Sequence, residues 1–197
     1  LQIFGDGPVK VAVAEVQPDL SFRATASVRG EVAPGVPLSH MVNVLGQGRC
    51  AITLDPRERL PGQQTYQGVV PLSDAAGRPL ERLSDVIGHY MQQSEQLDTR
   101  LVLAADASIA AGVLIQRMPA MGQANLSGTA AVAHESDALG ANEDFHRIAT
   151  LASSLTRQEL LGLDADAILH RLFWQENLLR LAPSSAAQAH PRFACTC

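Results

Sequence analysis

The chain has 197 residues, a formal net charge of -5 and a pI near 5.6. Because binding to nucleic acid needs clustered Lys and Arg, and the sequence has no basic run, this charge argues against a nucleic-acid partner. No stretch approaches the roughly 18 apolar residues that span a membrane, and the first residues lack the features of a signal peptide. Three cysteines do not make the disulfide framework of a secreted protein, so the composition predicts a soluble cytoplasmic chain without a membrane partner.

Alternation of apolar and polar residues dominates the first part of the chain and predicts β-strands there. The apolar spacing changes to that of a helix over residues 79–96, where Pro79 suits the first helical turn. We therefore predict a β-rich core domain over residues 1–121, an α+β fold with a mostly antiparallel sheet and one crossing helix. The predicted strands cover residues 9–16, 21–32, 48–56, 65–72, 99–106 and 110–119.

The middle of the chain is different in character. Residues 122–142 are small, polar and aperiodic, which predicts a flexible loop. Apolar residues return at helical spacing from Glu143 onward. Residues 143–182 are therefore predicted to form a helical linker region.

Helix-start signals divide this linker region. Thr156 and Glu159 have the spacing of a capping box, and Asp164 is the predicted N-cap of a last helix that runs to Leu181. The apolar residues of these helices are spaced to form one buried stripe. The stripe consists of Phe145, Ile148, Leu151, Leu155, Ile168, Leu169, Leu172, Phe173 and Leu179.

The last residues carry two of the three cysteines, Cys195 and Cys197, after a Pro-, Ser- and Ala-rich stretch. In an extended segment these two side chains lie on one side, about 6.6 Å apart, and modest rotation lets both thiolates reach one zinc ion. A structural zinc site takes four ligands, so this pair alone leaves such a site incomplete. Residues 183–197 are predicted to be a tether and the first half of a metal site. The alternative is a pair of terminal thiols without a shared role.

Other chemistry is poorly supported by the sequence. Cys50 lies in a strand-like run and is predicted to be a buried core residue. The G-x-G pairs at Gly5 and Gly46 lack the third glycine and the following helix of a phosphate-binding loop, which favours tight turns. His134-Glu135 has no second histidine at metalloprotease spacing, and no G-x-S-x-G elbow occurs. We therefore predict that the chain is not an enzyme.

Several segments, taken in order, resemble the redox-regulated heat-shock chaperones of the thirty-three-kilodalton class, which are bacterial holdases with a zinc switch. The resemblance covers most of the chain, and the S-E-Q-L-x-T-R block, the Q-x-M-P ending and the final C-T-C carry most of it. The matching segments are GDGP at Gly5, VRGE at Val28, GQGRCAIT at Gly46, YQGVV at Tyr66, YMQQSEQLDTRL at Tyr90, AAGVLIQRMP at Ala110, LLGLDADAILHRLF at Leu160 and FACTC at Phe193.

The resemblance implies a function for the C-T-C ending. In that family a C-x-C pair is the first half of a four-cysteine zinc site, so Cys195 and Cys197 are expected zinc ligands. Oxidation is expected to join Cys195 and Cys197 in one disulfide, release the zinc and loosen the linker. The chain would then act as an ATP-independent holdase for unfolded client proteins, with a homodimer as the expected active form.

The chain also departs from the family pattern. It has no C-x-x-C pair to complete the zinc site, and it lacks the family's helical segment before Leu1, so we expect a fragment missing sequence at both ends. Residues 122–142 look like an insertion. Two other classes remain alternatives: a thiol-dependent peroxidase or metal hydrolase that uses the C-x-C pair, and a plain structural or adaptor domain. Under the chaperone hypothesis, clients bind a sheet face that the helices of Glu143–Leu181 cover.

Overall fold

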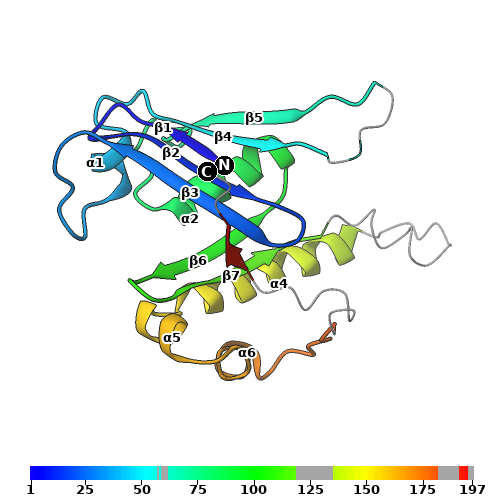
Figure 1. The fold of residues 1–197 in the computed structure, drawn as a ribbon. Helices are drawn as coiled ribbons and strands as arrows, with labels where there is room; N and C mark the ends of the chain where they lie inside the picture. The colour runs from blue at the N-terminus through cyan, green and yellow to red at the C-terminus, as the bar shows by residue number, and fades with distance from the viewer. Residues whose placement is uncertain (57, 59–61, 119–134, 182–190, 195–197) are drawn as a thin grey trace. The chain divides into compact units, whose positions relative to one another are not determined.

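A computed structural model of the chain describes residues 1–56, 58, 62–118, 135–181 and 191–194, with the backbone alone for 135–142 (Figure 1). The chain divides into two compact units. The first unit consists of Leu1–Tyr90 together with Leu179–Cys197, and the second consists of Met91–Leu178. The fold is α+β with an antiparallel sheet, as the sequence predicts.

The first unit is built on a six-stranded sheet with the strand order β5-β4-β1-β2-β3-β8. Its strands are antiparallel except that β8 runs parallel to β3. Alternating apolar residues form the predicted strands, and the strand at the first residues pairs with both β2 and β4. The strands are β1 Gln2–Phe4, β2 Val9–Val16, β3 Ser21–Val28, β4 Arg49–Leu54, β5 Tyr66–Pro71 and β8 Arg192–Phe193.

A tight turn joins β2 to β3. The amide of Gln17 donates to the carbonyl of Ser21 at 2.8 Å, and Leu20 has a positive φ of 61°. The carboxylate of Asp19 accepts hydrogen bonds from the Ser21 amide at 3.0 Å and the Ser21 hydroxyl at 2.6 Å. This turn fixes the direction in which β3 starts, and with it the position of the outer sheet edge.

Two helices, α1 Leu38–Val42 and α2 Leu83–Tyr90, complete the first unit. The predicted helix over residues 79–96 begins later, at Leu83, because Pro79 pairs instead with Ser73 in an isolated β-bridge. The core of this unit is aliphatic, apart from the ring of a tyrosine. Its buried apolar side chains are Ile3, Val9, Val42, Cys50, Ala51, Val70, Leu72, Val86 and Tyr90.

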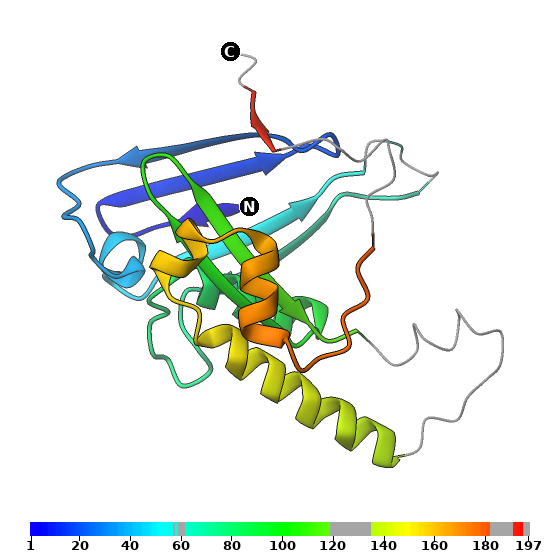
Figure 2. The same ribbon diagram turned by 90° about the horizontal axis from the view of Figure 1, so that it is seen from below.

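The second unit is a two-stranded antiparallel hairpin with helices packed on it (Figure 2). A π-helical turn, Met91–Glu95, precedes the hairpin. The strands are β6 Thr99–Ala105 and β7 Ala110–Gln116, and the helices are α4 Glu135–Ser153, α5 Arg157–Gly162 and α6 Ala165–Phe173. The predicted capping box of Thr156 and Glu159 and the predicted N-cap at Asp164 are both present.

Two boundaries differ from the prediction. Helix α4 starts at Glu135, so residues 135–142 are helical and do not belong to a loop; their Ala and Glu favour a helix without showing an apolar period. The rest of the predicted loop, residues 122–134, lies outside the described residues. The strands β6 and β7, predicted as part of a core domain over residues 1–121, group with the helices because the apolar side chains of the hairpin pack against them.

The predicted buried stripe is correct in its centre and wrong at its end. Helix α6 stops at Phe173, and Leu179, which lies beyond it, is 87% exposed. Leu151 is also partly exposed. The apolar spacing continues past Phe173 in the sequence, but no helix carries it, so Leu179 has no buried face to join.

Gly48 lies where the backbone before β4 passes close to α1. A Cβ atom at Gly48 would lie 2.6 Å from the carbonyl oxygen of Val42 and 2.7 Å from a methyl group of Leu72. The Gly48 amide donates to the buried side-chain oxygen of Asn43 at 2.8 Å, and the amide nitrogen of Asn43 donates to the carbonyl of Leu72 at 3.0 Å. This buried network leaves no room for a larger residue.

We predict that Gly48→Ala lowers the free energy of unfolding by about 1–3 kcal/mol, because the new methyl group would overlap backbone atoms. Gly162→Ala is the matched control, since nothing lies within 4 Å of a Cβ there and Gly162 ends a helix. Urea unfolding should show Gly162→Ala as neutral or up to about 1 kcal/mol more stable. Equal stability of the Gly48→Ala variant and the parent chain would contradict this packing.

Candidate functional site

The predicted metal and redox residues, Cys195 and Cys197, lie outside the described residues. The structure does describe the residues just before them, as far as Ala194. These residues form β8, a short strand that the sequence did not predict. The described part of the site is therefore the segment Arg192–Ala194, which leads to Cys195, and its attachment to the six-stranded sheet.

Strand β8 is attached to the outer edge of β3. Arg192 pairs with Ser21 and Phe193 pairs with Phe22 in parallel register. The amide of Arg192 donates to the carbonyl of Leu20 at 3.2 Å, and the amide of Ala194 donates to the carbonyl of Phe22 at 2.9 Å. The main chain next to Cys195 is thus held by the sheet through ordinary ladder hydrogen bonds.

An ion pair adds to this attachment. The Arg192 guanidinium contacts the Asp19 carboxylate at 2.8 Å. The hydroxyl and amide of Ser21, and then Arg192, lower the pKa of Asp19 to about 2 from its ordinary value of 3.8. The stability that Asp19 contributes through Ser21 and Arg192 is therefore present above about pH 3.8 and is lost as the pH falls through about 2. Both side chains are well exposed, so the pair orients the segment more than it stabilises it.

An aromatic contact completes the attachment. The rings of Phe22 and Phe193 meet edge to face, with centroids 6.0 Å apart and an interplanar angle of 81°. Phe193 remains 64% exposed. The contact is favourable, but much of the ring stays in solvent, so the segment can leave the edge without opening the core.

Cys50 lies apart from this chemistry. It is fully buried in β4, and burial raises the pKa of its thiol. Its burial confirms the prediction that Cys50 belongs to the core, and the raised pKa disfavours the thiolate that metal binding and nucleophilic attack require.

Within the described ranges there is no cluster of three His, Cys, Asp or Glu side chains that could hold a metal ion. The amides of Leu45 and Gln47, in the glycine-containing loop after α1, donate to the Asp6 carboxylate at 3.1 and 2.8 Å. A carboxylate already occupies the place that a phosphate would take, so this loop is a structural turn. Of the helices that are described, none is long and apolar enough to cross a membrane.

The second feature of functional interest is the helical cover on the β6–β7 hairpin. Six buried side chains of α4–α6 and their connections form its core, and partly buried side chains of the hairpin pack against them. The hairpin side chains are Val102, Ala104, Ala111, Val113 and Ile115; the helical ones are Ala152, Leu155, Leu160, Ile168, Leu172 and Phe173.

Polar contacts line the rim of this cover. Arg100 in β6 donates to the hydroxyl of Ser153 at 2.8 Å, and Arg157 in α5 donates to the carbonyl of Ala105 at 2.7 Å. Exposed contacts of this kind contribute about 0–1 kcal/mol each, whereas burial of one Leu or Phe contributes about 1.5–3 kcal/mol. The apolar core therefore holds the helices on the hairpin.

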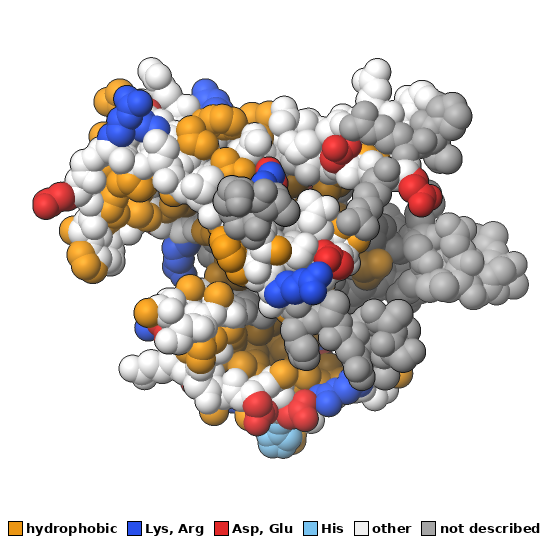
Figure 3. Space-filling model, viewed as in Figure 1, with side chains coloured by type: hydrophobic (Ala, Val, Ile, Leu, Met, Phe, Trp, Pro, Cys, Tyr) orange, Lys and Arg blue, Asp and Glu red, His pale blue; other side chains and the backbone are white. Residues whose placement is uncertain are grey.

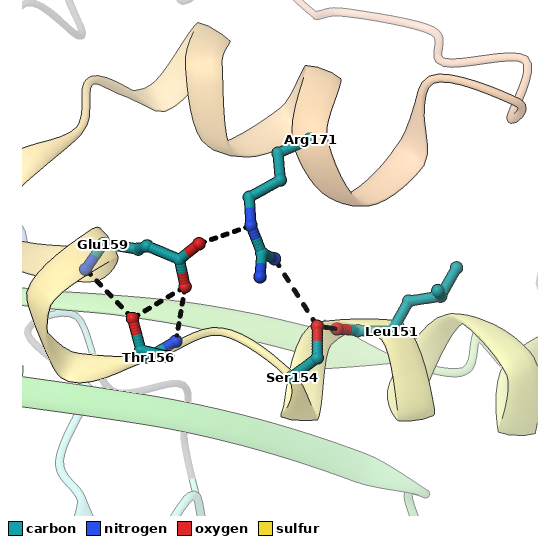
Figure 4. Close-up of polar contacts among 5 residues, drawn as sticks. All are labelled: Leu151, Ser154, Thr156, Glu159 and Arg171. Atoms are coloured by element: carbon teal, nitrogen blue, oxygen red, sulfur yellow. Dashed lines mark hydrogen bonds and ion pairs between the residues drawn. The ribbon is translucent and has the colours of Figure 1, made fainter.

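One carboxylate joins the two last helices (Figure 4). Glu159 accepts hydrogen bonds from the amide and hydroxyl of Thr156 at 2.9 and 2.7 Å, and it pairs with Arg171 of α6 at 2.5 Å. The hydrogen bonds from Thr156, and then the charge of Arg171, lower the pKa of Glu159. Arg171 also reaches the hydroxyl of Ser154 at 3.4 Å. The same residue thus caps α5 and fixes α6 beside it.

A family model described as Hsp33 protein matches residues 1–197. The chain belongs to the Hsp33 family.

Curated relatives agree with this assignment. The 33 kDa chaperonin of Methylobacillus flagellatus is 39% identical over 178 residues, which are 90% of this chain and 51% of that protein. The 33 kDa chaperonin of Chromobacterium violaceum is 41% identical over 180 residues, with the same coverage of each chain. The chain thus spans about half the length of these Hsp33 relatives.

A solved structure supports the fold. The crystal structure of the 33 kDa chaperonin from Thermotoga maritima matches with a TM-score of 0.63 at 16% identity, over 100% of this chain and 59% of the other. At this identity the likeness concerns the fold alone, and it is consistent with the mixed α+β architecture of an Hsp33 protein.

Sequence reasoning found the cysteines but missed what holds the segment that carries them. Arg192 and Phe193 make up a two-residue strand, which is too short to show alternation. Their partners, Asp19 and Phe22, lie more than 160 residues earlier. Arg192 and Phe193 stand directly before the cysteine pair, but nothing local in the sequence indicates a partner for them.

We predict that the Cys50 thiol is protected in the native chain. In a chain carrying Cys195→Ser and Cys197→Ser, Cys50 should react with a disulfide reagent about a hundredfold more slowly than in the same chain in denaturant, because the thiol is buried and protonated. Absorbance of the released thiolate measures the rate. Reaction at the same rate in both states would show that Cys50 is accessible and would contradict its assignment to the core.

Proposed function

We propose that the chain is the client-binding part of an ATP-independent holdase whose access to clients is controlled by the redox state of Cys195 and Cys197. The Hsp33 relatives are named chaperonins, which supports a chaperone function. The observation that carries the proposal is the helical cover on β6–β7, because it is an apolar surface that can be exposed without unfolding the six-stranded sheet.

The redox step that we propose uses two thiols and one two-electron oxidant. Hydrogen peroxide oxidises the thiols of Cys195 and Cys197 to one disulfide, and the peroxide is reduced to two molecules of water. The i, i+2 spacing would place the two sulfur atoms on one side of the chain if this segment is extended. Reduction by a dithiol reverses the step.

The thiolate pair also suits zinc, which favours sulfur ligands. Zinc bound to Cys195 and Cys197 would keep both sulfur atoms deprotonated and therefore open to oxidation. A closed site needs further ligands from outside this pair, since the third cysteine of the sequence, Cys50, is buried in the core. The resemblance also supports a homodimer as the active form.

A thiol-dependent peroxidase remains the alternative. It would consume peroxide repeatedly when a reducing thiol is supplied, whereas a switch reacts once and then binds protein. The rate of peroxide loss with excess dithiothreitol distinguishes the two.

The test of the proposal is light scattering of a thermally unfolding client, without ATP, with the chain at equal concentration under reductant and then under peroxide. We predict suppression of scattering by the oxidised chain. Suppression in both conditions would mean a holdase without its redox control. The absence of suppression in either condition would contradict the proposal, provided that circular dichroism shows the chain folded.

Substitutions that loosen the helical cover should allow client binding without oxidation. Leu172 and Phe173 are each 4% exposed, and changing either to serine should cost about 2–5 kcal/mol of the packing of α6 on the hairpin. We predict that Leu172→Ser and Phe173→Ser suppress client scattering under reductant, where the parent chain does so weakly.

Leu179→Ser is the matched control. It makes the same chemical change at a leucine that is 87% exposed, so it should leave both stability and client binding unchanged. Equal client binding by all three variants and the parent would count against the helical cover as the client-binding surface. Thermal melting of each variant shows whether the first unit remains folded.

A further inference from the structure

The outer edge of β3 is the one sheet edge in the described chain to which another part of the same chain, far away in sequence, has added a short parallel strand. The added segment Arg192–Ala194 uses only the first part of this edge, donating to the carbonyls of Leu20 and Phe22. No described strand pairs with β3 on this side beyond Phe22. The edge is thus partly filled and partly open.

The direction of the backbone groups shows what the open part offers. Ser21 accepts a hydrogen bond from Gln17 on the β2 side, whereas Leu20 and Phe22 accept from β8 on the outer side. Because these directions alternate along a strand, Ala24 and Ala26 also point their amides and carbonyls outward. Together with Phe22 they form a row of backbone groups that a longer added strand would pair with.

The side chains do little to prevent such pairing. Proteins usually protect an edge with lysine, proline or a bulge on the edge strand. From Ala24 to Ser27 the side chains of β3 are small and uncharged, and the one irregularity of the β2–β3 pair lies at Val9/Val11 of β2. Arg23 is the charged residue here, and it is paired with Glu15 of β2 at 2.6 Å. The edge is therefore chemically open to another extended chain.

Exposed apolar side chains lie beside this edge. Phe22 is opposite Val16 in the register of β2 and β3, and these side chains are 36% and 67% exposed. Leu20, in the turn before β3, is 39% exposed. Figure 3 shows hydrophobic side chains at the surface of the molecule. An added strand would gain ladder hydrogen bonds and also contacts for an aromatic or aliphatic side chain.

We propose that the outer edge of β3, from Leu20 to Ala26, binds extended segments of unfolded polypeptide as an added parallel strand, and that Arg192–Ala194 is an internal occupant that a client segment displaces. The occupant indicates the preferred chemistry: an aromatic residue beside Phe22, and a basic residue just before it, beside Asp19. This inference rests on the proposed holdase function, and it names a binding surface separate from the helical cover.

A peptide tests the edge directly. The probe is a fluorescein-labelled peptide of sequence HPRFAVTVT, which repeats residues 190–194 and continues with a β-prone tail to lie opposite Ala24 and Ala26. The amides of Arg192 and Ala194 face β3, whereas the amide of Phe193 points away by alternation. Fluorescence anisotropy measures binding to the full chain carrying Arg192→Pro, which removes the internal donor to Leu20.

We expect N-methylation of the peptide at the arginine or at the alanine to weaken binding by about tenfold, and N-methylation at the phenylalanine to leave it within about twofold. We also expect weaker peptide binding to the parent chain, where the internal segment competes. Equal effects of the three N-methyl groups, or no binding, would overturn the proposal. Because this arm uses no unfolded client, it decides the edge independently of the holdase assay.

A second arm uses reduced, carboxymethylated α-lactalbumin, which stays unfolded, and the variants Ala24→Pro and Ala24→Val. The proline removes an outward amide but leaves the ladder to β2, and the valine keeps the amide. We expect about tenfold weaker binding for the proline variant alone. Unchanged client binding by the Ala24→Pro variant would contradict the β3 edge as a client-binding surface, but it would not contradict the holdase function. Concentration-dependent protection of the Ala24 and Ala26 amides without client would instead assign the edge to a second copy of the chain.

Discussion

A two-stranded hairpin cannot bury its own apolar face, and this constraint organises the second unit. The side chains of Val102, Val113 and Ile115 must be covered by something, and α4–α6 cover them with a core of six buried residues. Since the polar contacts at the rim are exposed and weak, the stability of the cover depends on these few apolar side chains. A cover held in this way can open without disturbing the hydrogen bonds of either sheet.

In the first unit, too, another segment of the chain covers an exposed surface, but here the surface is the row of backbone hydrogen-bonding groups on the outer edge of β3. The short strand β8 pairs with only the first residues of β3, and beyond Phe22 the outer edge of β3 keeps ladder hydrogen-bonding groups that its small side chains do not block. Both surfaces are thus occupied by segments that come later in the sequence than the strands they cover. In a holdase, weakly held internal segments would cover the open sheet edge and the exposed hydrophobic surface, and would prevent self-association until a client binds.

The sequence was informative where patterns are long and local. Alternation located β2, β4 and β5 to within a few residues, and the spacing of Thr156 and Glu159 identified a cap that the structure contains. Leu179 was misplaced because periodicity does not show where a helix stops. The attachment of Arg192 to Asp19 depends on a contact across 173 residues, and the grouping of β6 and β7 with the helices depends on which apolar faces meet. Tertiary packing decides both.

The helical-cover model requires that α5 and α6 leave the β6–β7 hairpin when the chain is oxidised and stay off it while a client is bound. Hydrogen exchange of the reduced chain, the oxidised chain and the oxidised chain with reduced, carboxymethylated α-lactalbumin tests this most directly. We predict that amides of Arg157–Gly162 and Ala165–Phe173 lose protection on oxidation and stay unprotected with the client, while those of Thr99–Ala105 keep protection through pairing with β7. Full protection of both helices in a chain that holds the client would contradict it.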